Sequence, residues 1–162
     1  MQSLQKEFKF LLCEAEQQLI SAKNLSEILY PSLNDSKILL KALQQITKAE
    51  TTLITLALKR EYIQKRIRLA TDPQKNKEIF FKKSAKRYGL QKNQQDILRQ
   101  LLILGENYKK SGCTFPQKEK AIILNDDGTF NEITPLIIKR GLFVLQNLIK
   151  ALKTESANSR KL

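Results

Sequence analysis

Apolar side chains in the first part of the chain recur at alternating steps of four and three residues, a spacing typical of a helix that packs along another helix. One series predicts a helix over residues 4–30, which Pro31 ends because proline disfavours helical geometry in the residue before it. A second series predicts a longer helix over residues 36–69. Alanines lie seven positions apart in both series, so we expect the two helices to approach closely as an antiparallel hairpin.

The third predicted helix ends near Tyr88 and has two chemically different faces. Asp72 and Pro73 are typical of a helix start, and Gly89 suits the left-handed residue that follows a helix end. On a helical wheel, one face is aromatic or small and the opposite face is cationic. The first face comprises Phe80, Phe81, Ser84, Ala85 and Tyr88, and the second comprises Lys82, Lys83, Lys86 and Arg87. A fourth helix is predicted over residues 93–110.

After the fourth predicted helix, the pattern changes from helical spacing to short strands. Residues 120–124 have the composition of a strand, and residues 129–133 alternate between polar and apolar side chains. The Asp-Asp-Gly sequence between them is typical of a tight turn. We therefore expect a short β-hairpin over about residues 119–133, which must pack on the helices because an isolated hairpin is marginal in water.

Thr134 and Pro135 suit the start of a last helix, which is expected to end near Lys153. The predicted fold class is therefore all-α, a five-helix bundle with a small β-hairpin before the last helix. The low numbers of glycine and proline, five and four, also favour helices over a sheet-rich fold. A chain of 162 residues has the length of one domain, which we place at residues 1–153, followed by a polar C-terminal tail over residues 154–162.

Compartment can also be predicted from the sequence. No apolar run approaches the ~20 residues that a transmembrane helix needs, and the N-terminus lacks the basic start and apolar core of a signal peptide. The two cysteines, Cys13 and Cys113, are far apart and form no C-x-x-C pair, although the sequence leaves a disulfide between them open. These features predict a cytoplasmic protein in a reducing compartment, without a membrane partner.

Positive charge is concentrated in one part of the chain. The segment 59–92 carries twelve Lys or Arg and three acids, a local net charge of +9, whereas the whole chain carries +13. Residues 1–58 are neutral overall, and residues 93–162 carry a net charge of +4. A basic cluster with few nearby acids is typical of a protein that binds a polyanion. The same composition also fits a solvated helix surface with no partner, so both interpretations stay open.

If the cluster binds phosphates, the candidate nucleic-acid-binding residues form two patches. Lys59, Lys65, Arg66 and Arg68 would supply one patch, and Lys82, Lys83, Lys86 and Arg87 would supply the other. Tyr62 and Tyr88 lie in the same segment and are candidates for stacking on bases. Contacts to phosphates give affinity without sequence readout, and they weaken steeply with salt.

Arg60 occupies a position where the apolar spacing predicts a buried apolar residue. Its guanidinium can reach water beyond the end of the partner helix, or it can face inward at a pocket. The sequence leaves both explanations open, so Arg60 is a candidate pocket residue.

The chain offers little catalytic chemistry. It contains no histidine, which removes the usual general base and the commonest zinc ligand. The five glycines are scattered singly, so a glycine-rich phosphate loop is missing, and Ile123 takes the place of an oxygen ligand that a calcium loop would need. We therefore predict a protein without catalytic residues, metal or cofactor, although the sequence leaves catalysis by lysine or carboxylate groups alone open.

Two segments resemble known helical proteins. Residues 15–25, with the sequence AEQQLISAKNL, are followed by a long second helix. Together they resemble the start of HEPN-type helical bundles. The segment from Phe115 through residues 120–127 into the last helix resembles small uncharacterised archaeal proteins. The HEPN resemblance implies a small helical bundle, often dimeric, from toxin–antitoxin or RNA-processing systems. Active members use an Arg followed closely by a His, so the resemblance implies that this chain is a binding, antitoxin-like or degenerate member.

The leading functional hypothesis is a non-enzymatic protein that binds RNA or DNA phosphates through residues 59–92. The alternative is a protein–protein module that forms a homodimer or binds an acidic protein partner through its helix faces. An exposed apolar patch on the last helix would favour this alternative. An enzyme is the third hypothesis, and it would need a deep pocket lined by Arg60 and carboxylates.

Overall fold

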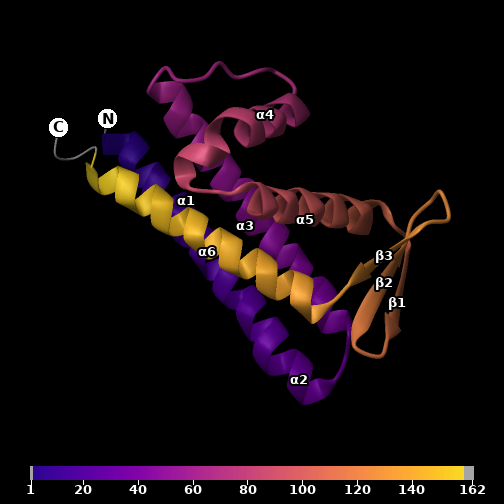
Figure 1. Cartoon of the computed structure of the whole chain (residues 1–162). Coiled ribbons are helices and arrows are strands. Elements are labelled where there is room, and N and C mark those ends of the chain that lie inside the picture. Colours follow the sequence, from indigo (N-terminus) through magenta and orange to yellow (C-terminus); the bar gives the residue numbers. More distant parts are fainter. Residues whose placement is uncertain (1, 159–162) are drawn as a thin grey trace.

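The computed structural model describes the backbone of residues 2–158 and the side chains of residues 2–155. Within that range, five helical segments and a small three-stranded antiparallel sheet make up the fold (Figure 1). The predicted helical architecture is therefore confirmed, with the sheet directly before the last helix. None of the helices in this range combines the length and the apolar character that a membrane span needs.

The first helical segment and α3 form the long antiparallel hairpin that the apolar spacing predicts (Figure 1). α1 (Gln2–Asn24) continues through a π-helical turn, η1 (Leu25–Leu29), into α2 (Tyr30–Leu33). α3 (Lys37–Ile63) then returns along α1. The alanines that lie seven apart are 0% exposed, as expected of small residues that let two helices pack closely. These residues are Ala15, Ala22, Ala42 and Ala49.

Pro31 does not end the first helix, contrary to the prediction. The helix continues to Leu33, and Asn34 follows it in a left-handed conformation with a φ of 52°. The π-helical turn lies directly before the proline, and there the N–H of Tyr30 donates to the carbonyl of Leu25. This turn widens the helix and shifts its hydrogen bonds by one residue, which accommodates a ring that would clash in a regular α-helix.

The third helical segment changes its winding twice. Asp72 caps the start of α4 (Pro73–Ile79), because its carboxylate accepts a hydrogen bond of 2.9 Å from a backbone N–H of the first turn. The segment continues as a π-helical turn, η2 (Phe80–Ser84), and a 3₁₀ turn, η3 (Ala85–Tyr88), before Gly89 ends it with a φ of 76°. The two predicted faces are confirmed, because the aromatic and small residues are buried and the four cations are exposed.

α5 (Lys92–Lys110) and α6 (Pro135–Asn158) complete the bundle, and both pack against α3. α5 agrees closely with the predicted fourth helix. α6 extends beyond its expected end at Lys153, so the first part of the predicted tail is helical. Residues 159–162 of that tail lie outside the described residues.

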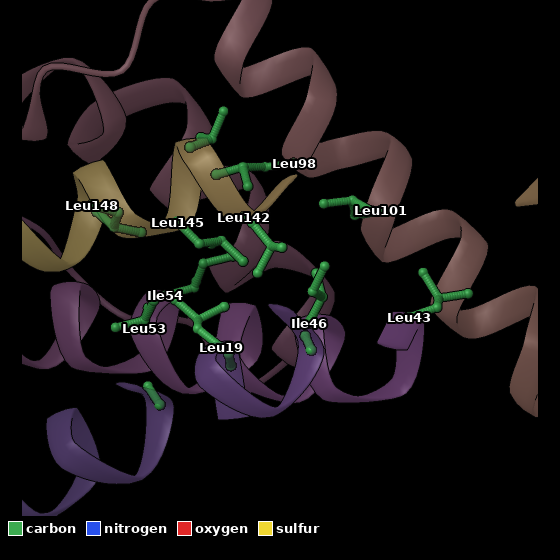
Figure 2. Packing of buried hydrophobic residues seen from close by; sticks show 14 of the residues in the cluster. Leu19, Leu43, Ile46, Leu53, Ile54, Leu98, Leu101, Leu142, Leu145 and Leu148 are labelled. Carbon is green, nitrogen blue, oxygen red and sulfur yellow. The ribbon is translucent and has the colours of Figure 1, made fainter. Parts of the chain in front are cut away.

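The core lies between α1, α3, α5 and α6, where aliphatic side chains from these helices meet (Figure 2). Leu19, Leu53, Leu101 and Leu145 come from the four helices in turn, and each is at most 3% exposed. Burial of one such side chain contributes roughly 1.5–3 kcal/mol. Phe80 continues this core into the third helical segment, which fixes that segment against α3.

The predicted hairpin is present as β2 (Lys120–Leu124) and β3 (Phe130–Ile133), and a third strand, β1 (Cys113–Gln117), joins it. The strand order is β1-β2-β3, and both pairings are antiparallel. The sequence did not predict β1, because this edge strand is largely exposed and lacks the alternation of a half-buried strand. Pro116 is compatible with the edge position since it has no N–H to donate to a neighbour.

Candidate functional site

α3 ends earlier than the apolar spacing predicts, at Ile63, and the turn that ends it builds the candidate site. Lys65 has a left-handed φ of 57°, and its N–H donates to the carbonyl of Tyr62 at 2.9 Å. The next N–H, of Arg66, donates to the carbonyl of Glu61 at 2.9 Å. These two hydrogen bonds are those of a Schellman motif. The turn therefore brings Arg66 back over the last turn of α3.

Glu61 is the centre of the site, because its carboxylate forms ion pairs with two arginines. Arg66 lies 3.2 Å away (Nη1 to Oε1), and Arg87 of η3 contacts Oε2 through its own Nη1. The hydroxyl of Tyr88 donates to Oε1 at 3.4 Å. The two positions that Glu61 and Arg66 occupy in a Schellman motif commonly make an apolar contact, and here an ion pair replaces it. We refer to these four residues as the Glu61 cluster.

The partners of Glu61 compensate for its burial, which would otherwise be costly for a carboxylate. The side chain of Glu61 is 0% exposed, whereas those of Arg66 and Arg87 are 41% and 42% exposed. One buried negative charge thus holds two half-exposed positive charges, so the outer side of the cluster is cationic. Burial, together with the neighbouring Glu61 carboxylate, raises the pKa of Tyr88 well above its ordinary value, which keeps the hydroxyl protonated as a donor.

Glu61 also brings together the two basic patches that the sequence predicts. Arg66 comes from the first patch and Arg87 from the second, and both bind the same carboxylate. Five other predicted cations are exposed and form no ion pair with any described residue: Lys65, Arg68, Lys82, Lys83 and Lys86. We call these five residues, together with Arg66 and Arg87, the basic surface.

Lys59, the eighth predicted residue, has a carboxylate partner of its own on α1. Its ammonium lies 2.8 Å from Glu7, and the two side chains are 46% and 49% exposed. An ion pair this exposed contributes at most about 1 kcal/mol to stability. Lys59 therefore lies against α1, whereas Glu61 contacts η3. Because its charge is paired with Glu7, Lys59 does not belong to the basic surface.

An open depression of about 540 Å³ adjoins the basic surface at Lys86. Lys92, at the start of α5, contributes a second cation to it. The full lining comprises Lys86, Gly89, Leu90, Gln91, Lys92 and Gln95. The cationic area therefore continues from η3 toward the first turn of α5.

Arg60 turns its guanidinium into the protein, and its side chain is 9% exposed. Nη1 donates to the carbonyl of Leu152 at 2.9 Å and lies 3.6 Å from the carboxylate of Glu155, both on α6. The guanidinium also lies over the ring of Phe8, 4.4 Å from its centroid. These contacts account for a charged residue among the apolar positions, because they pair the guanidinium and link the ends of α1, α3 and α6.

The two tyrosines that were candidates for base stacking differ in exposure. Tyr88 is 4% exposed and belongs to the Glu61 cluster, so its ring is not available to a ligand. Tyr62 lies on the last turn of α3 and is 55% exposed. Of the two, Tyr62 alone has a ring that a ligand can reach.

A second buried carboxyl group lies on α3, and sequence reasoning overlooked it as it did Glu61. Glu50 is 0% exposed, and neither carboxyl oxygen has a hydrogen-bond partner among the described residues. Burial raises its pKa well above the ordinary value of 4.5, and the positive charge of Lys77 opposes this shift. Glu50 and Glu61 are eleven residues apart on one helical face with Ile54 and Ala57, and a pair of acids on an otherwise apolar face was the signal in the sequence.

No group of three or more Cys, Asp or Glu side chains in the described part of the chain is arranged to hold a metal ion. Cys13 and Cys113 are both exposed as free thiols. No protein-family model matches this chain, and neither a curated protein nor a solved structure shows significant similarity to it.

Proposed function

We propose that this protein binds nucleic acid through the phosphate backbone, using the basic surface, and that it does so without catalysing a reaction. The observation that carries the proposal is the Glu61 cluster, in which a buried carboxylate holds Arg66 and Arg87 side by side. Each guanidinium uses Nη1 for Glu61, so its remaining N–H groups are left to donate to a phosphate. A fixed pair of arginines loses less conformational freedom on binding than two mobile side chains do.

The lysines around this pair add positive charge, but no ion pair fixes the positions of their ammonium groups. Lys65 flanks Arg66, Lys86 flanks Arg87, and neither lysine pairs with a carboxylate among the described residues. Cations of this kind bind phosphates by releasing counterions, so their contribution depends on salt and not on base sequence. The proposed activity is therefore general affinity for nucleic acid rather than recognition of one sequence.

The test replaces cations that form no ion pair with any described residue. Lys82, Lys83 and Lys86 are all changed to Glu, while Arg66 and Arg87 are kept because they neutralise Glu61. Binding of RNA and DNA oligonucleotides is measured by fluorescence anisotropy at several salt concentrations. We expect affinity to fall about tenfold or more, and the slope of log affinity against log salt to decrease by roughly 0.9 for each phosphate that the variant no longer neutralises.

A matched control changes the net charge equally at the other end of the bundle. Lys41, Lys48 and Lys139 are also exposed, and they lie near the starts of α3 and α6. Changing these three to Glu should lower affinity much less, because they lie far from the basic surface. Equal losses in both variants would mean that net charge alone attracts nucleic acid, and unchanged binding in the first variant would refute the assignment.

A second candidate function is a protein–protein module, as the resemblance to HEPN-type bundles would imply. The observation in its favour is two exposed apolar side chains on α6, Leu136 and Phe143, which are 53% and 61% exposed and lie on one face, seven residues apart. A homodimer formed through this face would persist at high salt, because apolar contacts are not screened. Light scattering of the wild type and of Phe143→Ser at high salt distinguishes this function from nucleic-acid binding.

A further inference from the structure

An exposed aromatic ring lies on the same turn as Arg66, one of the two arginines of the Glu61 cluster. Tyr62 directly follows Glu61, and the carbonyl of Tyr62 accepts one of the two hydrogen bonds of the Schellman motif. The backbones of Tyr62 and Arg66 are therefore fixed by the same capped turn. The Tyr62 ring is 55% exposed, and its hydroxyl has no hydrogen-bond partner among the described residues.

We infer that the basic surface binds single-stranded nucleic acid, with the ring of Tyr62 stacked on a base while Arg66 and Arg87 hold neighbouring phosphates. This inference rests on the proposed function and adds the class of nucleic acid to it. Proteins that bind single strands without sequence preference commonly combine cations along the backbone with aromatic rings under the bases. The last turn of α3 and the turn that follows it offer both groups within five residues, from Tyr62 to Arg66.

The ring distinguishes a single strand from a duplex for a physical reason. Bases in a duplex are stacked on each other and paired, so they present no free face to a ring on a protein surface. A duplex would therefore contact the cations alone, whereas a single strand would contact the cations and the ring. An exposed apolar side chain next to Tyr62 in the sequence supports a contact with bases, because Ile63 is 58% exposed.

Salt should affect the two kinds of contact differently. Ion pairs with phosphates weaken as salt rises, because counterions compete for the phosphates. Stacking on Tyr62 involves no ion exchange, so it is expected to persist. The preference for a single strand over a duplex should consequently grow with salt concentration.

The experiment measures binding of the full chain to four labelled probes of equal length by fluorescence anisotropy. The probes are single-stranded oligouridine RNA, single-stranded oligothymidine DNA, and mixed-sequence RNA and DNA duplexes. Replacing Tyr62→Ala should weaken binding of the single strands about tenfold or more, the size typical of one stacked base, and leave duplex binding unchanged. Tyr62→Phe should bind like the wild type, since stacking uses the ring and not the hydroxyl.

Phe130→Ala is the matched control, because Phe130 is an exposed aromatic residue on β3, 67% exposed and away from the basic surface. This variant should bind every probe like the wild type, and thermal unfolding should show that all variants remain folded. Unchanged binding of both single strands by Tyr62→Ala, or equal losses on single strands and duplexes, would overturn the inference while leaving the proposed function intact. A wild type that binds none of the four probes would overturn both.

Discussion

Glu61 and Glu50 lie on the same face of α3 and are both fully buried, but their surroundings differ. Glu61 binds two guanidiniums and accepts a hydrogen bond from Tyr88. Glu50 has no hydrogen-bond partner among the described residues, and its pKa is raised because burial disfavours the charged form. The same side chain on the same helix is therefore a charged anchor at one position and a destabilised carboxyl group at the other.

The difference shows what a buried carboxylate needs before it can serve a binding site. At Glu61 the partners arrive from outside the helix, one on the capping turn and one on η3, 26 residues away in sequence. At Glu50 the opposite charge that lowers the pKa is that of Lys77, whose ammonium lies 3.5 Å from Glu106 on α5 instead. Partnered burial positions cations for a ligand, whereas unpartnered burial costs stability and supplies no fixed cation.

Removal of both arginines should have the largest effect, because it gives Glu61 an environment like that of Glu50. The double change Arg66→Ala and Arg87→Ala is expected to reduce the free energy of unfolding by about 3–5 kcal/mol at neutral pH, as when a buried ion pair loses one side. Urea unfolding at neutral pH measures this loss.

Lys59→Ala is the matched control for that prediction, since it breaks the exposed pair with Glu7 on the same helix. This change should lower the free energy of unfolding by less than about 1 kcal/mol, because both side chains of the pair are half-exposed. A double arginine variant that loses no more stability than Lys59→Ala would show that the Glu61 carboxylate does not depend on its partners.

Replacement of the two glutamates by leucine should have a smaller effect that is opposite in sign at the two positions. Glu50→Leu is expected to raise the free energy of unfolding by about 1–3 kcal/mol at neutral pH, because it removes a buried polar group without partners. Glu61→Leu is expected to lower it, because it leaves Tyr88 and two arginines without their acceptor. Chemical unfolding of both variants tests the pair.

The pH dependence of Glu50 follows from the direction of its pKa shift. A carboxyl group whose pKa is raised on folding binds protons more tightly in the folded state, so wild-type stability should fall as pH rises from the ordinary 4.5 through the raised value. Glu50→Leu should remove this part of the slope, and its advantage over the wild type should shrink in acid, where only the cost of burying the neutral carboxyl group remains. An advantage that is the same at all pH values would contradict the assigned cause.

Tyr88→Phe should change the free energy of unfolding less than the arginine and glutamate substitutions do. The change removes the hydroxyl that donates to Glu61 at 3.4 Å and keeps the buried ring, so we expect a loss of about 1 kcal/mol in the free energy of unfolding. Tyr62→Phe removes an exposed hydroxyl without a partner among the described residues and should cost nothing measurable. A comparison of the two variants by thermal unfolding separates a hydrogen bond from a general effect of the substitution.

Much of the fold could be predicted because apolar spacing reports which side chains are buried. Ile67 is a clear case, since it is 6% exposed as the spacing predicts, although it lies beyond the end of α3. Spacing predicts burial but not backbone conformation, so it placed the end of α3 too late. The break at Pro31 was predicted from the proline itself, and the helix continues past it to Leu33. β1 was not predicted, because an exposed edge strand shows no alternation of apolar and polar residues in the sequence.

The candidate site was only partly predictable for a similar reason. The excess of cations over acids indicated the region, and the two-faced third helix indicated which side of it is exposed. The role of Glu61 depends on a contact with Arg87 that the chain makes only when folded. Local composition counted Glu61 as one negative charge in a basic segment, whereas its position makes it the group that organises the cations around it.

The wide turn η2 and the narrow turn η3 make the number of residues between Phe80 and Arg87 important for the position of the Arg87 side chain. Each residue advances a helix by about 100°, so a turn with an extra residue rotates everything after it. A deletion of one residue in this stretch would carry the Arg87 guanidinium about a quarter of a revolution away from its carboxylate. Residue types at the exposed positions of this segment are therefore expected to vary freely among related sequences, whereas the length of the segment is expected to stay constant.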